Sequence, residues 1–300
     1  MKCFDLQVNG AFGVDYNAPD LTADDFLRSA EKVLAAGVTR FLPTIITSAM
    51  VQYARVLPLL SEASARAGLG HEIPGLHLEG PFFATEASIG AHNPAWMQRP
   101  TPEALHRLND LAGGKIRLLT VAAEADGVIE TAAEARRMGI AVSLGHHLAT
   151  AAQIRAVDAQ ALTHFGNGLP NTIPRHCGTV WGALADERLT AMVITDGHHV
   201  PPEFITAVLR LKGLERFIVV SDATNAAGMP PGPIRALGND AILEPNGLLH
   251  NPAKGCLVGS ASLMPQCLAH LRSLNLLDEA GLEQVAWRNP HRLLGEQPQE

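Results

Sequence analysis

The chain has 300 residues, of which 47% are hydrophobic and 18% are charged, and its net charge is −7. This composition is typical of a globular protein and excludes a fibrous or wholly disordered chain. The negative net charge gives no electrostatic basis for binding nucleic acid or an anionic membrane. No apolar run reaches the roughly 18 residues that a spanning helix needs, and the opening MKCFDLQVNG lacks the apolar core of a signal peptide.

Short strand-like runs alternate with helical patterns from the N-terminus to Asp222. Most of the strand-like runs are nearly continuous in apolar residues, as expected for strands buried on both faces. They are Cys3–Val8, Thr39–Pro43, Ile73–Glu79, Ile116–Ala122, Ile140–His146, Ala161–His164, Leu189–Asp196 and Phe217–Asp222. The helical patterns are Thr22–Ala36, Ala49–Arg66, Pro102–Leu111, Gly127–Met138, Ala149–Val157 and Pro202–Leu211.

Eight strands that alternate with helices predict an α/β fold, a closed parallel (β/α)8 barrel. The alternative is an open doubly wound sheet, but no G-x-G-x-x-G or Walker loop follows any strand. After Asp222 the alternation ends, and an Asn-Gly pair predicts a β-hairpin insertion within Ala241–Val258. Helices are expected at about Ser262–Ser273 and Glu279–Trp287. Since no linker divides the chain, we expect a single domain over residues 1–300.

Polar side chains that can bind a metal follow five of the eight predicted strands. Because the active site of such a barrel lies at the carboxyl ends of its strands, these side chains should meet there. One glutamate and two histidines are a common ligand set for catalytic zinc. The motifs are His77-Leu78-Glu79, Gly145-His146-His147, Thr163-His164, Thr195-Asp196-Gly197-His198-His199 and Ser221-Asp222.

Each of these residues also has a purely structural interpretation. Glu79 and Asp222 could cap the helices that follow them. One of His146 and His147 could be a buried structural histidine, because adjacent strand residues point to opposite faces and at most one of the two enters the barrel mouth. The convergence of all of them on one face of the predicted barrel favours the metal site.

Six segments in chain order carry a resemblance to a known family. They are HLEGPFF (77–83), GAHNP (90–94), SLGHH (143–147), THFGN (163–167), TDGHHV (195–200) and VSDATNAAG (220–228). Together they resemble the N-acetylglucosamine-6-phosphate deacetylases of the amidohydrolase superfamily. The likeness runs from Asp5 to about Met264. It implies a metal-dependent barrel enzyme that hydrolyses an amide.

The resemblance implies a role for individual positions. Glu79, His146 and His164 match the metal ligands of the family. Asp222 matches its catalytic aspartate, and His92 matches a histidine that contacts the substrate near the scissile amide. The other matches are substrate contacts: Asn167, the amide of Gly168, His199 and Arg175 toward the phosphate, and Leu263 and Met264 around the acetyl group.

The first strand favours a single metal ion. Amidohydrolases with two metals usually end this strand in H-x-H, whereas this chain has Gln7-Val8-Asn9 there. Amides are poor zinc ligands beside imidazole or carboxylate. We therefore expect one divalent ion. Zinc is the first choice, although iron and other divalent ions accept the same ligands and the sequence does not fix the native metal.

The expected activity is hydrolysis of the acetamido group of N-acetylglucosamine-6-phosphate to glucosamine-6-phosphate and acetate. Water activated by the metal would be the nucleophile, and Asp222 would act as general base and then general acid. Deacylation of a different N-acyl sugar or N-acyl amino acid is the alternative within enzymes. A non-catalytic sugar-phosphate sensor is the alternative outside them, but a sensor has no need for a general base. The sequence leaves the stereochemistry of the sugar and its phosphorylation open.

The resemblance also implies a homodimer, in which Arg175 reaches the phosphate in the neighbouring subunit; an ordinary loop arginine is the alternative for this residue. Four scattered cysteines without a C-x-x-C pair favour reduced thiols and a cytoplasmic protein. The family normally wraps both termini into a small β-sandwich beside the barrel. Because Met1 directly precedes the first predicted strand, we expect this sandwich to be absent.

Overall fold

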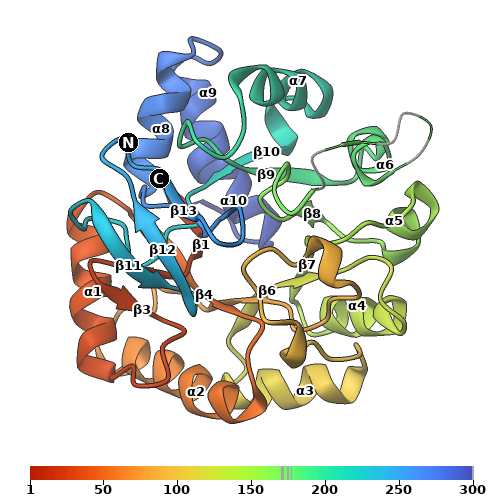
Figure 1. Ribbon diagram of the computed structural model, residues 1–300. Helices are drawn as coiled ribbons and strands as arrows, with labels where there is room; N and C mark the ends of the chain where they lie inside the picture. The colour runs from red at the N-terminus through yellow and green to blue at the C-terminus, as the bar shows by residue number, and fades with distance from the viewer. Residues whose placement is uncertain (170–171, 174–175, 177, 299–300) are drawn as a thin grey trace.

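The computed structural model describes residues 1–169, 172–173, 176 and 178–298. Eight parallel strands form one sheet in chain order (Figure 1), and an isolated bridge links Val8, at the end of the first strand, to Ala223, three residues after the last strand. The strands are β1 (Phe4–Val8), β4 (Arg40–Ile46), β5 (Leu76–Glu79), β6 (Ile116–Val121), β7 (Ala141–Leu144), β8 (Ala161–Leu162), β9 (Thr190–Ile194) and β10 (Phe217–Val220). The predicted (β/α)8 barrel is therefore confirmed.

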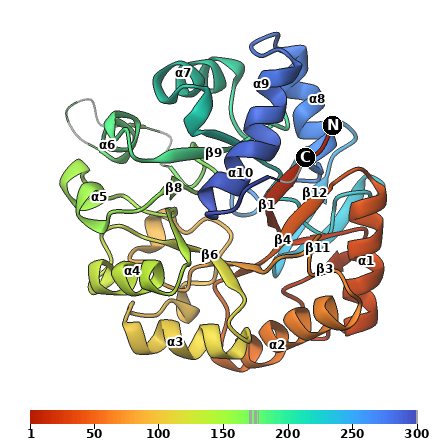
Figure 2. The ribbon, with the colours of Figure 1, turned by 180° about the vertical axis from the view of Figure 1, so that it is seen from behind.

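Helices surround the strands, as the views from both ends of the barrel show (Figures 1 and 2). They are α1 (Ala23–Ala35), α2 (Met50–Arg66), α3 (Pro102–Leu111), α4 (Val128–Arg137), α5 (Ala151–Val157), α6 (Thr179–Ala185) and α7 (Pro202–Lys212). At the start of α1, the Thr22 hydroxyl accepts a hydrogen bond from the Asp25 N–H at 3.1 Å, as its capping position predicts. The sequence did not predict α6, which has no side-chain cap at its start and contains Gly182 in its interior.

The barrel interior is apolar toward the amino-terminal halves of the strands. Leu42, Leu118, Met192 and Ile218 form an inner cluster there with Trp287. A separate, larger cluster packs the outer faces of the strands against the helices. The polar side chains at the carboxyl ends of the strands therefore meet above an apolar floor.

A β-bulge in β1 changes which side chains face the barrel interior. The pairing of β1 with β4 shifts by one residue between Asp5 and Val8. Before the shift Leu6 belongs to the inner cluster, whereas after it Val8 belongs to the outer cluster. A bulge re-aims the residues that follow it, and here it directs Gln7 and Asn9 into the barrel, where both are fully buried.

Asp5 holds this bulge and gives the folded protein a pH dependence. Its Oδ1 accepts hydrogen bonds from the N–H groups of Gln7 (3.2 Å) and Ser221 (3.1 Å). Burial, only partly offset by these hydrogen bonds, raises the pKa of Asp5 to about 6. The unfolded value is about 3.9, so the folded state binds more protons between pH 4 and pH 6. The stability contribution of Asp5 therefore falls as the pH rises through this window.

We expect Asp5→Asn, which keeps the accepting oxygen, to remove this dependence. The free energy of unfolding of the wild type, minus that of the variant, should fall by on the order of 2–3 kcal/mol between pH 4 and pH 6 and then level off. Urea unfolding of both proteins across pH 4–7 measures the difference. If the free energies of unfolding of the wild type and the variant change in parallel with pH, the Asp5 carboxyl has the same pKa in the folded and unfolded states, which would contradict the prediction.

The segment after β10 forms a second sheet rather than a single hairpin. Four antiparallel strands follow one another in order: β11 (Gly232–Ala236), β12 (Asn239–Leu243), β13 (Leu249–Asn251) and β14 (Cys256–Leu257). The predicted hairpin is the centre of this sheet. The first strand, β11, was not predicted, because its glycine- and proline-rich start resembles a loop.

Three helices end the chain: α8 (Met264–Ser273), α9 (Glu279–Glu283) and α10 (Asn289–Leu293). The predicted helix over Glu279–Trp287 is divided, since α9 continues as a π-helical turn over Gln284–Arg288. Within the described ranges, no helix combines the length and the hydropathy needed to cross a membrane.

Candidate active site

A cavity of about 370 Å³ lies at the carboxyl ends of the barrel strands. The second sheet covers part of it with Leu237, Cys256 and Leu257. The predicted site residues among its lining are Glu79, His92, His146, His164, Asn167, Gly168, His199 and Asp222. The structure thus brings together eight residues that come from strand ends and loops across the whole barrel.

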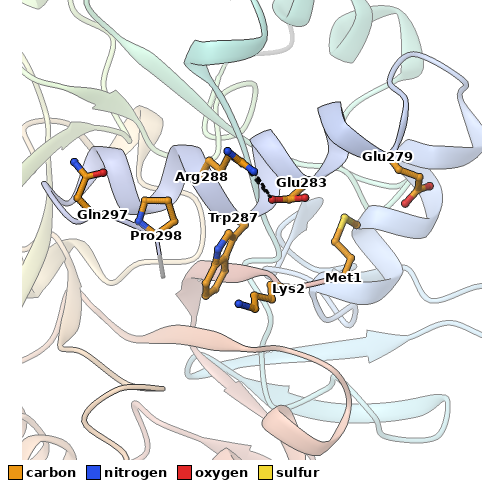
Figure 3. A pocket seen from close by; sticks show the side chains of 8 residues that line it. All are labelled: Met1, Lys2, Glu279, Glu283, Trp287, Arg288, Gln297 and Pro298. Carbon is orange, nitrogen blue, oxygen red and sulfur yellow. Dashed lines mark hydrogen bonds and ion pairs between the residues drawn. The ribbon is translucent and has the colours of Figure 1, made fainter. Parts of the chain in front are cut away.

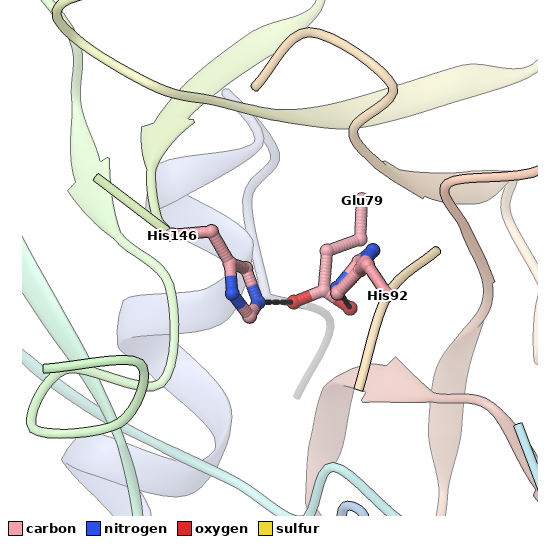
Figure 4. Close-up of side chains that lie close together, drawn as sticks. All are labelled: Glu79, His92 and His146. Carbon is pink, nitrogen blue, oxygen red and sulfur yellow. Dashed lines mark hydrogen bonds and ion pairs between the residues drawn. The ribbon is translucent and has the colours of Figure 1, made fainter. Parts of the chain in front are cut away.

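Three potential metal ligands converge in this cavity. Glu79 Oε1 lies 2.8 Å from His164 Nε2 and 3.1 Å from His146 Nε2, and the two Nε2 atoms are 3.0 Å apart. Figure 4 shows the imidazole of His146 directed at the Glu79 carboxylate, with His92 on the other side of that carboxylate. All four side chains are buried.

A contact on the far side of the His146 ring fixes which of its two nitrogens faces Glu79. His146 Nδ1 lies 2.9 Å from the carbonyl oxygen of Ser88, so this nitrogen carries the proton. Its Nε2, on the opposite side of the ring, lies 3.1 Å from Glu79 Oε1, at the point where the possible ligand atoms meet. A ring nitrogen oriented by a carbonyl partner in this way is typical of metal-binding histidines.

The charges of the cluster are strongly coupled. Burial by itself would raise the pKa of Glu79, but hydrogen bonds from His146 and His164 hold it well below its usual value. Burial opposes protonation of His164, whereas the hydrogen bond and the negative charge of Glu79 raise its pKa. Glu79 is therefore an ionised carboxylate that attracts positive charge to this point.

The structure tests whether a divalent ion fits these residues. Glu79, His92 and His146 can each place one ligand atom within 4.8 Å of the others, and His164 adds a nitrogen closer to Glu79 than that of His92. Carboxylate oxygen and imidazole nitrogen are the donor types that catalytic zinc and other divalent ions use. The donor set fits a divalent metal.

The backbone is strained at three of the site residues. His146, His164 and Asp222 have φ angles of 50°, 29° and 52°, in the left-handed region that non-glycine residues rarely adopt. Such a conformation costs of order 1–3 kcal/mol per residue and persists where the surrounding structure imposes it. Each lies two residues beyond the end of a barrel strand, and all three side chains line the cavity.

His92 is arranged as a hydrogen-bond donor toward the cavity. Its Nδ1 accepts a hydrogen bond from the N–H of Thr47 at 3.3 Å, which leaves the proton of the neutral ring on Nε2. Burial, together with the nearby His146, lowers the pKa of His92 well below its usual value. Its Nε2 lies 4.0 Å from Glu79 Oε2, beside the ligand cluster. The ring therefore stays neutral and offers an N–H to a substrate.

Asp222 faces the same cavity and is held by the side-chain amides of Gln7, in β1, and Asn9, directly after β1. Gln7 Nε2 and Asn9 Nδ2 donate to Asp222 Oδ1 at 2.9 Å and 2.7 Å. Burial and the negative charge of Glu79 raise the pKa of Asp222 to about 7. Sequence reasoning treated Gln7 and Asn9 only as replacements for metal ligands. Their contact with Asp222 joins residues more than 200 positions apart in the chain. No local sequence pattern could therefore predict it.

Asp196 is a site residue that sequence reasoning did not assign. Its Oδ2 accepts hydrogen bonds from His199 Nδ1 (2.9 Å) and from the Ser260 hydroxyl (2.8 Å), and its Oδ1 accepts the N–H groups of His198 and His199. The bond to Nδ1 leaves Nε2 of His199 for the cavity. The available signal was the T-D-G-H-H motif itself, in which an acidic residue stands three positions before the histidine.

Asn167 and Gly168 form the rim of the cavity beside His164. Asn167 Nδ2 donates to the carbonyl oxygen of His164 at 3.0 Å. Gly168 has a φ of +69°, and a Cβ on it would lie 3.0 Å from the carbonyl oxygen of Ser88. In the described part of the chain no backbone acceptor pairs with the Gly168 N–H.

Other predicted residues lie elsewhere. Leu263 and Met264 are buried at the start of α8 and are not among the residues that line the cavity. The lining includes the apolar side chains of Ile46, Leu169, Leu237 and Leu257. His147 points away, with Nδ1 3.9 Å from Glu124 Oε2, as the opposite orientation of adjacent residues predicts. Arg175 lies outside the described residues.

A second hollow of about 830 Å³ lies at the other end of β1, beside Met1 and Lys2 (Figure 3). Its lining includes Trp287 and an ion pair between Arg288 and Glu283 at 3.0 Å. None of the described residues with a predicted role lines it. The chemistry of the molecule is therefore concentrated in the smaller cavity.

Comparisons with known proteins show the family of this chain. No family model matches the chain. The N-acetylgalactosamine-6-phosphate deacetylase of Escherichia coli O157:H7 is 30% identical over 296 residues, which cover 97% of this chain and 76% of that protein. The N-acetylglucosamine-6-phosphate deacetylase of Bos taurus is 34% identical over 307 residues, covering 97% and 73%. The chain belongs to the N-acetylglucosamine-6-phosphate deacetylase family.

Solved structures of this family show the same fold. The N-acetyl-D-glucosamine-6-phosphate deacetylase of Mycobacterium smegmatis superposes with a TM-score of 0.89 and 29% identity, over 98% of this chain and 78% of that one. A mutant of that enzyme has been solved in complex with N-acetyl-D-glucosamine-6-phosphate and superposes equally well. The resemblance inferred from the six sequence segments is confirmed.

Proposed function

We propose that this protein is a metal-dependent deacetylase that hydrolyses the acetamido group of N-acetylglucosamine-6-phosphate and releases acetate. The observation that carries the proposal is the position of Asp222 beside the Glu79–His146–His164 cluster in one cavity. A ligand set of one carboxylate and two imidazoles, next to a carboxyl group with a pKa of about 7, suits hydrolysis of an amide at neutral pH. The family membership supports the same activity.

Glu79, His146 and His164 would hold one divalent ion, which we propose to be zinc. Their three ligand atoms lie within 3.1 Å of one another. His92 is a weaker candidate because its Nδ1 already accepts the Thr47 N–H and its Nε2 is 4.0 Å from the carboxylate. When bound, such an ion lowers the pKa of water and polarises the carbonyl group of an amide.

Asp222 and His92 carry out the proton transfer and the hydrogen bonding that the reaction needs. Asp222 accepts a proton from the attacking water through Oδ2, because Oδ1 is already occupied by two amide donors. It then returns the proton to the departing nitrogen as the C–N bond breaks, which gives acetate and a free amine. His92 donates its Nε2–H to the carbonyl oxygen of the amide. The dry inner cluster below the site keeps bulk water from the floor of the barrel.

The phosphate end of the substrate would lie against His199, Asn167 and the N–H of Gly168. Charge-assisted hydrogen bonds from such donors suit a dianion better than a neutral sugar. We expect His199→Ala to raise KM for the phosphorylated substrate by about 10- to 100-fold, and to change KM for unphosphorylated N-acetylglucosamine by less than a factor of three. Initial rates on both sugars measure this. An equal effect on both would show that the natural substrate lacks a phosphate.

The galactosamine-6-phosphate derivative is the second candidate substrate, since the relative from Escherichia coli O157:H7 bears that name. The two sugars differ in the orientation of one hydroxyl group. Acetate release from N-acetylglucosamine, N-acetylgalactosamine and N-acetylmannosamine, each with and without a 6-phosphate, ranks them by kcat/KM. We expect the glucosamine-6-phosphate derivative to rank first. A higher kcat/KM for the galactosamine-6-phosphate derivative would make that sugar the substrate, with the same deacetylation reaction.

We further propose that the protein works in the cytoplasm as a homodimer, with Arg175 reaching the phosphate in the neighbouring subunit. The free thiols of Cys3, Cys256 and Cys267 support a reducing compartment. The match of Arg175 to the family supports the shared site. Sedimentation of the purified protein gives the oligomeric state, and Arg175→Ala should raise KM in parallel with His199→Ala.

A further inference from the structure

Gln7 and Asn9 are the only buried amide side chains that contact Asp222 among the described residues, and their chemistry suggests more than a structural role. Gln7 lies in β1 and Asn9 directly after it, and both side chains are fully buried. Both donate to the same atom, Asp222 Oδ1, at 2.9 Å and 2.7 Å. We propose that Gln7 and Asn9 are positioning residues that orient the Asp222 carboxylate so that Oδ2 alone faces the reacting atoms. This inference rests on the proposed function.

The orientation of the two amides is fixed by the charge of their partner. A carboxylate accepts hydrogen bonds and cannot donate them, so the NH₂ groups must face Asp222. In this orientation the amide oxygens Gln7 Oε1 and Asn9 Oδ1 are buried without a hydrogen-bond partner in the described chain. Unsatisfied buried oxygens are unfavourable and uncommon. Apolar residues would fill these positions without that penalty, so the contact with Asp222 is their evident use.

The bulge in β1 is the structural device that makes the contact possible. In an unbroken strand, Leu6 and Val8 would share the inner face, and Gln7 and Asn9 would point outward. The register shift moves Val8 to the outer cluster and brings both amides inside. The backbone N–H of Asn9 also donates to the carbonyl oxygen of Ala223 at 2.7 Å, which fixes β1 against the residue next to Asp222.

Asp222 requires such support because its own backbone is strained. Asp222 has a φ of 52° and lies beyond the end of β10. The regular pairing of the sheet therefore does not set the direction of its side chain. With Oδ1 held from two directions, rotation of the carboxylate is blocked. No donor among the described residues occupies Oδ2, which therefore remains open to the cavity.

The test uses Gln7→Met and Asn9→Leu, which keep the size of each side chain and remove its donor. Each should lower kcat by about 10-fold, leave KM within twofold, and leave the metal content unchanged. In an Asp222→Asn background the same changes should add less than a twofold loss, because the oriented base is already gone. The control is Ser143→Ala, which removes a buried acceptor of the Thr163 hydroxyl elsewhere in the barrel and should keep kcat within twofold.

A second readout does not depend on catalysis. The side-chain amide protons of Gln7 and Asn9, followed by NMR in the full-length protein with labelled glutamine and asparagine, should resonate downfield and move upfield in Asp222→Ala. Unchanged resonances would overturn the contact itself, whether or not the enzyme deacetylates sugars. Shifted resonances combined with wild-type kcat in both Gln7→Met and Asn9→Leu would overturn the positioning role. If the resonances move in Asp222→Ala but the wild-type protein deacetylates no amino sugar, the contact stands and only the proposed function is contradicted.

Discussion

Asp222→Asn is expected to lower kcat by about 10²–10⁴-fold while the protein keeps its metal and its fold. The range is that of a general acid–base group. An asparagine can still accept the two hydrogen bonds from Gln7 and Asn9 at Oδ1, so its position should be retained. It has no oxygen at the second position to take the proton of water, and no proton to give to the leaving amine.

Single-turnover rates at saturating substrate, together with metal analysis of the same sample, measure this effect. Asp186→Asn is the matched control, because it changes another buried aspartate, paired with Arg188 outside the barrel mouth. It should keep kcat within threefold. A near-normal rate in Asp222→Asn would remove Asp222 from the mechanism, and loss of metal in that variant would make it a ligand instead.

Replacing His164 and His92 one at a time should show which of the two histidines binds the metal. His164 Nε2 lies 2.8 Å from Glu79 Oε1, whereas His92 Nε2 lies 4.0 Å from Glu79 Oε2. We expect His164→Ala to weaken metal binding by more than the roughly 10–100-fold that loss of a ligand's hydrogen-bond partner produces. We expect His92→Ala to bind the metal nearly as well as the wild type and to lose activity through kcat.

The measurement is a metal titration of the two variants and the wild type after removal of bound ions with a chelator. Because both changes replace a buried imidazole in one cavity by a methyl group, each variant is the control for the other. The opposite order of affinities would show that Glu79, His92 and His146 hold the ion. Equal losses in both variants would indicate four protein ligands.

Much of this site could be predicted because it lies at strand ends. Glu79, His146, His164 and Asp222 each follow an apolar run, and a closed parallel barrel places all such positions on one face. The turn that follows each strand is itself unusual, with left-handed backbone at three of these residues. The sequence carries no signal for that strain, because none of the three is a glycine.

The residues that support the site were harder to find. The inward direction of Gln7 and Asn9 depends on a bulge, and a shift of one residue reverses every side chain after it. The second sheet was underestimated because β14 has two residues and β11 begins in a glycine- and proline-rich segment. Asp196 stood inside a recognised motif, yet its partner Ser260 comes from a distant loop that no local pattern connects to it.

The most direct test of the account is acetate release from N-acetylglucosamine-6-phosphate by the purified protein. We expect equal amounts of acetate and free amine, abolition of the reaction after the metal is removed with a chelator, and recovery when one equivalent of a divalent ion is restored. A protein that binds the ion but releases acetate from none of the N-acetylated amino sugars, with or without a 6-phosphate, would contradict it.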